Sequence, residues 1–106
     1  MALKQKWLIE ARSELEATLE YVQHEFGQRV VDMVYSDVVT RISLLQEYPD
    51  LGQRYKDLVY RGHEVRILHM KKSSIIYCHD EEFLYILTFW NNSRDDSLLG
   101  DIISLR

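Results

Sequence analysis

The chain has 106 residues, of which 46% are hydrophobic and 28% are charged, and its formal net charge is −4. This length predicts a single domain over residues 1–106 with its own core, and the composition excludes an intrinsically disordered chain. The acidic balance disfavours a general nucleic-acid binder, and no apolar run approaches the ~20 residues that a transmembrane helix needs.

Two features bear on the compartment. The single cysteine, Cys78, cannot form an internal disulfide, which agrees with a reducing environment. The residues after Met1 lack the long apolar segment and small-residue cleavage site of a signal peptide. We therefore expect a cytoplasmic protein without a membrane partner.

The first half of the chain carries the patterns of a strand and two helices. Lys4–Leu8 is predicted as a short edge strand. Apolar residues then recur at helical spacing in two stripes, which are Ala11, Leu15, Leu19, Val22 and Phe26, and then Val31, Val34, Val38, Ile42, Leu45 and Tyr48. Gly27 offers the positive φ common at a helix end, and Pro49 stops the second helix. So short a connection predicts an antiparallel helical hairpin.

The second half predicts a three-stranded antiparallel meander. Its strands are Glu64–Met70, Ser73–His79 and Phe83–Trp90, joined by short charged turns. The stretch Gln53–Gly62 is open to two interpretations, a short strand at Leu58–Tyr60 or a surface loop. The sequence therefore predicts an α+β fold, in which an N-terminal helical hairpin packs on a small antiparallel β-sheet and a short C-terminal helix follows.

The last two strands are apolar on both faces, so the sheet needs a second cover besides the helices. A partner protein or the C-terminal tail could supply it. In the tail, Ser97 is predicted to cap a short helix. That helix carries Leu98, Leu99, Ile102, Ile103 and Leu105.

Taken in order, several short pieces of the sequence resemble the RelE/ParE family of bacterial toxins from type II toxin–antitoxin systems. The pieces are Ala11–Leu15, Phe26-Gly27, Leu45 to Gly52 (LLQEYPDLG), Val65-Arg66-Ile67, Ile75-Ile76-Tyr77 and Ile86 to Arg94 (ILTFWNNSR). Each piece is weak alone, but their order and spacing cover about residues 5 to 98. The resemblance implies a growth-inhibiting toxin of the plasmid-stabilisation type, which a cognate antitoxin wraps and neutralises, with a homodimer or a heterotetramer with antitoxin as candidate assemblies.

The family has two branches, and the residues present separate them. RelE-like members cut messenger RNA on the ribosome, whereas ParE-like members are not nucleases and those studied poison DNA gyrase. Cleavage of RNA needs a proton acceptor, a proton donor and cations at the developing phosphorane. Where RelE-like toxins carry these groups, this chain has Ser74-Ile75, Asn91-Asn92 and Leu98, and only Arg94 is retained. The ParE-like branch is therefore favoured, and the sequence favours a binding role over an enzymatic one.

The candidate contacts with target or antitoxin are Arg66, Lys71, Lys72, Trp90 and Arg94, and Arg94 and Arg66 would be catalytic under the nuclease alternative. Each has a structural alternative. Arg66 could pair with Glu64 or Asp95, which is the favoured interpretation, and Arg94 could form a loop salt bridge.

The remaining polar residues predict little chemistry. The four histidines lie at positions 24, 63, 69 and 79 and show no metal-ligand spacing, and Cys78 is interpreted as a buried, inert thiol. We expect neither a metal nor a cofactor. Three functions stay open: a ParE-like toxin that binds a target such as DNA gyrase, a diverged RelE-like endonuclease acting on the ribosome and mRNA through Arg94 and a histidine, and an inactive remnant that binds its antitoxin.

Overall fold

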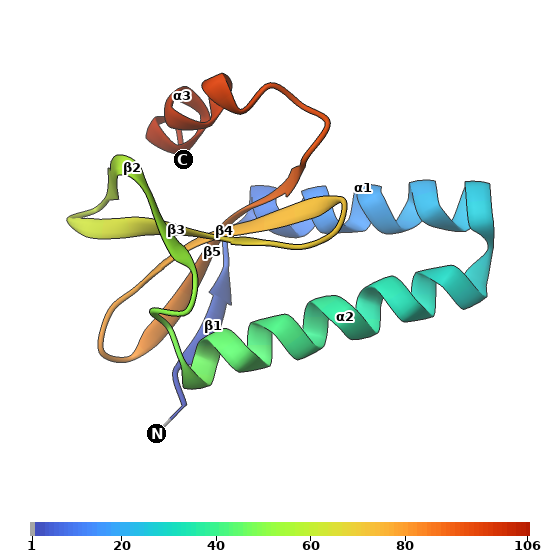
Figure 1. Cartoon of the computed structure of the whole chain (residues 1–106), viewed down its shortest axis with the longest axis horizontal. Helices are drawn as coiled ribbons and strands as arrows, with labels where there is room; N and C mark the ends of the chain where they lie inside the picture. Colours follow the sequence, from blue (N-terminus) through green and yellow to red (C-terminus); the bar gives the residue numbers. More distant parts are fainter. Residues whose placement is uncertain (1) are drawn as a thin grey trace.

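A computed structural model describes residues 2–106 and shows a helical hairpin beside a twisted sheet, with a small C-terminal helix on the other side (Figure 1). The elements in chain order are β1 (Lys4–Trp7), α1 (Ile9–Phe26), α2 (Gln28–Glu47), β2 (Gln53–Tyr60), β3 (His63–His69), β4 (Ser73–His79), β5 (Phe83–Asn91), the 3₁₀ turn η1 (Asp96–Leu98) and α3 (Leu99–Ser104). The predicted α+β fold is confirmed. Within the described residues, no helix is long and apolar enough to cross a membrane.

The sheet differs from the prediction in size and in direction. It has five strands in the order β1-β5-β4-β3-β2, and β1 runs parallel to β5. The prediction of a purely antiparallel sheet was therefore wrong, because the N-terminal strand β1 pairs in parallel with β5, the last strand in the sequence. That pairing continues past β1, where the N–H of Leu8 donates to the carbonyl of Ile86 at 3.0 Å.

Of the two interpretations left open for residues 53–62, the strand is the one that the structure shows, as β2. It covers Gln53–Tyr60 and not only its last three residues. Its pairing with β3 shifts register between Arg54 and Val59, and Lys56 there has a positive φ of 52°. The irregularity breaks the alternation of buried and exposed residues, so the strand has no regular sequence signature.

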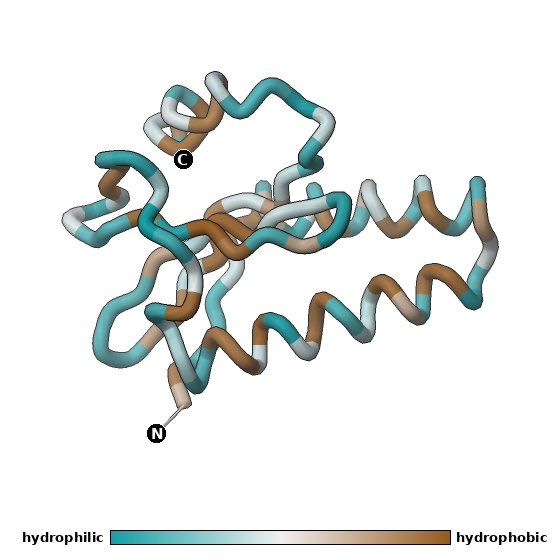
Figure 2. Tube along the Cα trace, viewed as in Figure 1, coloured by the Kyte–Doolittle hydropathy of each residue, from teal (hydrophilic) through white to brown (hydrophobic). Residues whose placement is uncertain are grey.

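The helical hairpin projects beyond the sheet. Gly27 separates α1 from α2 with a φ of 87°, as predicted for the helix end. The buried residues of the two helices, Ala11, Leu15, Val38, Ile42 and Leu45, lie in the halves next to the sheet. The far halves extend past the strands to the turn at Gly27, and apolar segments continue along them (Figures 1 and 2).

The C-terminal tail supplies the second cover of the sheet. Leu99 and Ile103 of α3 are 0% and 2% exposed, and they pack on the sheet face opposite the hairpin together with Val65, Ile76 and Leu87. Of the two covers that the sequence left open, a partner protein or the C-terminal tail, the tail is therefore the one that covers this part of the sheet. Asp95, not Ser97, caps this segment, since its carboxylate accepts the N–H of Ser97 at 3.0 Å.

Candidate functional site

An apolar opening outside the core lies between the far half of the hairpin and one end of the sheet. It is a groove of about 530 Å³. Its lining residues are Val22 and Phe26 of α1, Val30, Met33, Val34 and Asp37 of α2, and Met70, Lys71, Lys72, Ser73 and Phe89 of the sheet and its β3–β4 turn. We call this surface the hairpin groove.

The hairpin groove leaves large apolar side chains in water. Phe26 is 58% exposed and Met33 is 63% exposed. Phe26 ends the first apolar stripe, which runs on past the point where the sheet ends, and Met33 of α2 lies next to the second stripe. Clustered exposure of this kind is unusual for a monomer and is typical of an interaction surface.

Two of the predicted contact residues, Lys71 and Lys72, lie at the rim of this groove. They occupy the β3–β4 turn, which is closed by the N–H of Met70 donating to the carbonyl of Ser73 at 2.8 Å. The N–H of Asn92 also donates to the carbonyl of Lys72 at 2.9 Å. Neither ammonium group forms an ion pair with a carboxylate of residues 2–106. Both charges are therefore available to a partner.

Trp90 and Arg94 lie on the opposite face of the sheet, next to α3. Trp90 is 2% exposed and packs with Leu99, so its ring is not presented to a partner in this conformation. The guanidinium carbon of Arg94 lies 4.4 Å from the centre of the Trp90 ring, in a cation–π contact on the outer side. Of this predicted pair, only Arg94 reaches the surface.

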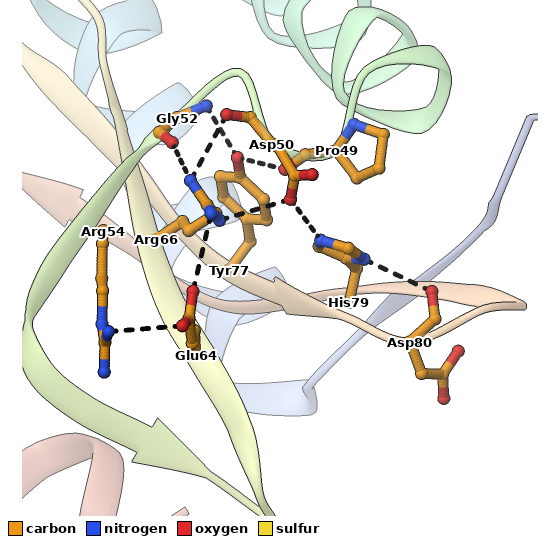
Figure 3. Close-up of polar contacts among 9 residues, drawn as sticks. All are labelled: Pro49, Asp50, Gly52, Arg54, Glu64, Arg66, Tyr77, His79 and Asp80. Atoms are coloured by element: carbon orange, nitrogen blue, oxygen red, sulfur yellow. Dashed lines mark hydrogen bonds and ion pairs between the residues drawn. The ribbon is translucent and has the colours of Figure 1, made fainter.

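Arg66 belongs to a network of hydrogen bonds and ion pairs that fastens the α2–β2 turn to the sheet (Figure 3). We call this network the clamp, and its residues are Pro49, Asp50, Gly52, Glu64, Arg66, Tyr77 and His79. Its Nη1 donates to the carbonyl of Gly52 at 2.8 Å and to that of Asp50 at 3.3 Å. Its Nη2 lies 3.5 Å from Oε2 of Glu64, which confirms the predicted pairing with Glu64. The donors of Arg66 are used within the molecule, so it contributes to structure at this position.

Tyr77 and His79 complete the clamp from β4 (Figure 3). The hydroxyl of Tyr77 donates to the carbonyl of Pro49 at 2.7 Å and accepts the N–H of Gly52 at 2.8 Å. Burial raises the pKa of Tyr77, so this hydroxyl stays protonated. Nε2 of His79 lies 2.9 Å from Oδ1 of Asp50, and this contact lowers the pKa of Asp50. Together these contacts form a structural network that holds the α2–β2 turn in place.

A second cavity, of about 550 Å³, lies beside Arg94 on the α3 face. His69 and Asn92 line it, and both contact the fully buried Ser74. Nδ1 of His69 is 3.0 Å from the Ser74 hydroxyl, which donates to Oδ1 of Asn92 at 2.6 Å. This order of contacts leaves Nε2 of His69 as a potential proton acceptor near Arg94. Sequence reasoning did not single out His69, because only the strand pairing brings it next to Ser74.

Other candidate chemistry is not assembled by the fold. No group of three or more His, Cys, Asp or Glu side chains that could hold a metal ion occurs in the described part of the chain. Cys78 is fully buried, and burial raises its pKa to about 12, in agreement with an inert thiol. His24 is an exposed residue of α1 with an 86% exposed side chain.

These features define a small α+β domain with an exposed apolar groove between its helical hairpin and its sheet. The sequence matches no family model, and no curated protein matches it. Among solved structures, the chain is similar to one from the structure described as the chromosomal ParDE TA system from P. aeruginosa, with a TM-score of 0.68 and 21% identity. The match covers 85% of this chain and 96% of that chain. At this identity the likeness establishes a shared fold, which is the fold that the RelE/ParE resemblance implied.

Proposed function

We propose that this protein is the ParE-like toxin of a type II toxin–antitoxin pair, and that the hairpin groove is where its antitoxin binds. The observation that carries the proposal is the groove itself, which joins exposed apolar side chains of two helices to a rim with two free lysines. The shared fold with a chain of a ParDE system supports it.

The chemistry of the groove supports a partner of one particular form. An amphipathic helix or an added strand would lay its apolar face against Phe26 and Met33. Carboxylates at the edge of that face would pair with Lys71 and Lys72. A partner of this kind is a short acidic antitoxin segment, and it would remove from water the side chains that the hairpin leaves exposed. The assembly it forms, heterodimer or heterotetramer, is to be read from the mass of the purified complex.

The proposed mode of action is binding to a cellular target such as DNA gyrase. Three positions support this over RNA cleavage. Ser74 is buried where a nuclease would present an Arg, Arg66 is bound to the α2–β2 turn, and Asn92 is a neutral amide. RNA cleavage needs cations that stabilise the phosphorane, and Arg94 would be the only one at this site. The guanidinium group of Arg94 already stacks on Trp90.

One observation favours the endonuclease as the second candidate. His69 and Arg94 line the same cavity, so a potential proton acceptor and a cation lie together on one face. Asp95 and Asp96 line the cavity as well, and their charges oppose the approach of a phosphate. The third candidate is an inactive remnant that only binds antitoxin. The growth curve of cells that express the chain alone tests it, because a remnant would cause no growth defect.

The first experiment expresses the chain alone and together with the neighbouring small reading frame. We expect arrested growth in the first case, rescue in the second, and a complex that co-purifies. Met33→Asp should abolish co-purification, whereas Val59→Asp, an exposed apolar residue on β2 outside the groove, should leave it intact. Equal loss in both variants would argue against the groove.

A second experiment separates the targets. Primer extension on transcripts after induction, together with plasmid supercoiling, is measured for the wild type and for His69→Ala and Arg94→Ala. Altered supercoiling without cleavage supports gyrase. Cleavage within codons that both substitutions abolish supports the endonuclease.

A further inference from the structure

One edge of the sheet carries main-chain groups that no neighbouring strand pairs. β1 is an outermost strand, and its one neighbour in the sheet is β5. Successive residues of a strand direct their N–H and C=O groups to opposite edges, and the N–H groups of Lys4 and Leu8 both donate toward β5, at 3.0 Å. Lys6 follows the same alternation. The N–H and C=O groups of Gln5 and Trp7 therefore point to the outer edge of the sheet.

The first position on this outer edge shows the kind of group that it binds. The N–H of Leu3 donates to the main-chain carbonyl of Gln46 in the last turn of α2 at 2.9 Å, and Nε2 of Gln46 donates to the carbonyl of Leu3 at 2.7 Å. The next two positions along this edge, Gln5 and Trp7, have no such partner among residues 2–106. The end of α2 thus satisfies one residue of the edge and leaves two open.

The other edge of the sheet is less suited to pairing. Strand β2 shifts register between Arg54 and Val59, and the positive φ of 52° at Lys56 bends it there. An irregularity of this kind interrupts the row of donors and acceptors that an added strand would need. The short β1 pairs with β5 in one unbroken register, so its open groups are regularly spaced.

An apolar groove of about 450 Å³ lies beside the open edge, between β1 and the two helices. Gln5 and Trp7 line it, and the Trp7 side chain packs with the core of the hairpin. The buried Val38 also lines the groove, whereas Tyr35 and Val39 of α2 are 52% and 46% exposed. The open main-chain groups and these exposed apolar side chains therefore belong to one surface.

We propose that this surface binds an extended, uncharged segment of another protein, which adds a strand beside β1 and seats apolar side chains in the groove. Alternate amides of the segment pair with Gln5 and Trp7. Alternate side chains of a strand lie on one face, roughly 6.8 Å apart, so those on the hairpin side reach the groove near Tyr35. The charged lining residues, Arg12 and Glu16, have opposite signs. Main-chain pairing and apolar contact therefore select the segment, and charge does not.

Two other occupants fit this edge less well. A second copy would pair antiparallel about a two-fold axis, and the register that uses both Gln5 and Trp7 sets the two copies of Lys6 opposite each other, which is unfavourable for like charges. A nucleic acid has no row of amides, and the cation Arg12 that would meet its phosphates is offset by Glu16. The proposal does not rest on the antitoxin proposal, because this groove and the hairpin groove share no lining residue.

The test uses the full chain and a fluorescein-labelled six-residue peptide of alternating Ile and Thr, followed by fluorescence anisotropy. We expect saturable binding below millimolar peptide. Only one edge of the added strand faces β1. Methylating the backbone nitrogens of one set of alternate residues, the Ile or the Thr, should therefore weaken binding at least tenfold, and methylating the other set should leave it within twofold. Equal effects of the two sets would contradict strand pairing.

Variants of the chain separate this surface from the hairpin groove. Val39→Asp should weaken the peptide at least tenfold, whereas Met33→Asp, which changes an exposed apolar residue of the same helix within the hairpin groove, should leave binding unchanged. Gln5→Pro removes an N–H that β5 does not use, and proline is tolerated at such an edge position. This variant should keep the wild-type circular dichroism and still weaken binding at least tenfold.

Amide hydrogen exchange measures the same edge directly. In the free chain the amides of Gln5 and Trp7 should exchange faster than those of Lys6 and Leu8, and saturating peptide should slow the first pair. The proposal is overturned by absence of binding at millimolar peptide, by exchange at Gln5 and Trp7 that the peptide does not slow, or by equal weakening in Met33→Asp and Val39→Asp. A concentration-dependent dimer that Gln5→Pro dissociates would also overturn it, by assigning the edge to a second copy.

Discussion

Arg106, the last residue of the chain, binds Glu14 of α1 with both ends of its guanidinium group. Nη1 donates to Oε1 at 3.0 Å and Nη2 donates to Oε2 at 2.8 Å, and the two side chains are 11% and 20% exposed. Oε1 of Glu14 also accepts the hydroxyl of Thr88 at 2.8 Å and the N–H of Phe89 at 3.2 Å. One carboxylate therefore ties together the first helix, the last central strand and the C-terminus, and it holds α3 over the sheet.

This pair makes the C-terminus part of the fold. Removing one partner of a mostly buried, bidentate ion pair leaves polar groups unsatisfied, and we expect Arg106→Ala to lower the free energy of unfolding by roughly 2–3 kcal/mol. Urea unfolding followed by circular dichroism measures it. Arg41→Ala, which removes an exposed pair with Asp37, is the control and should change stability by less than about 0.5 kcal/mol. Equal effects in the two variants would contradict a structural role for Arg106.

Gly52 should tolerate no side chain. An added Cβ would lie 2.6 Å from the hydroxyl oxygen of Tyr77 and 2.8 Å from the carbonyl oxygen of Ile67, at the point where Arg66 fastens the turn. We expect Gly52→Ala to destabilise the protein by about 1–3 kcal/mol, because backbone has to move.

The matched control for Gly52 is Gly100→Ala. Its Cβ would come no closer than 3.5 Å to the Leu58 side chain, and the residue lies in α3. Alanine in a helix is favoured over glycine by about 0.5–1 kcal/mol, so this variant should be stabilised. Thermal unfolding of both variants checks the opposite signs, and destabilisation of equal size would show that the Tyr77 contact is not the cause.

Stability should fall at acidic pH through Asp50. The contact with His79 lowers the pKa of Asp50 below its ordinary value of 3.8. A carboxylate with a lowered folded-state pKa stabilises the protein above the unfolded pKa, and that stability is lost as the pH falls through the folded value. The urea midpoint of the wild type should therefore drop below about pH 4, and the difference from Asp50→Asn should shrink there. A difference that does not change between pH 2 and pH 6 would refute this linkage.

Cys78 should react only when the protein unfolds. It is fully buried and its pKa is raised to about 12 by burial, so almost no thiolate is present at pH 8. A chromogenic thiol reagent should label the denatured chain at once and the native chain no faster than it opens. Immediate labelling of native protein would mean that the α3 face of the sheet is open in solution.

Sequence periodicity was sufficient for the elements whose signals are local. Both helices, the turn at Gly27 and the three strands of the predicted meander lie within a residue or two of where their patterns placed them, because each pattern repeats over adjacent turns or alternate residues. The pairing of Arg66 with Glu64 could also be predicted from the sequence, since the two residues lie on one side of the same strand. The fold class could therefore be inferred before any coordinates.

Only the tertiary structure decided which surfaces are open. Trp90 has the sequence character of a surface anchor, yet α3 covers it, while Phe26 ends a regular helical stripe and stays exposed because the sheet ends before it. His69 meets Ser74 through strand pairing, and Glu14 meets Arg106 from the other end of the chain. The physical reason is that helix and strand patterns depend on neighbours a few residues away. Burial and ion pairing depend on which distant segments the packed chain brings together.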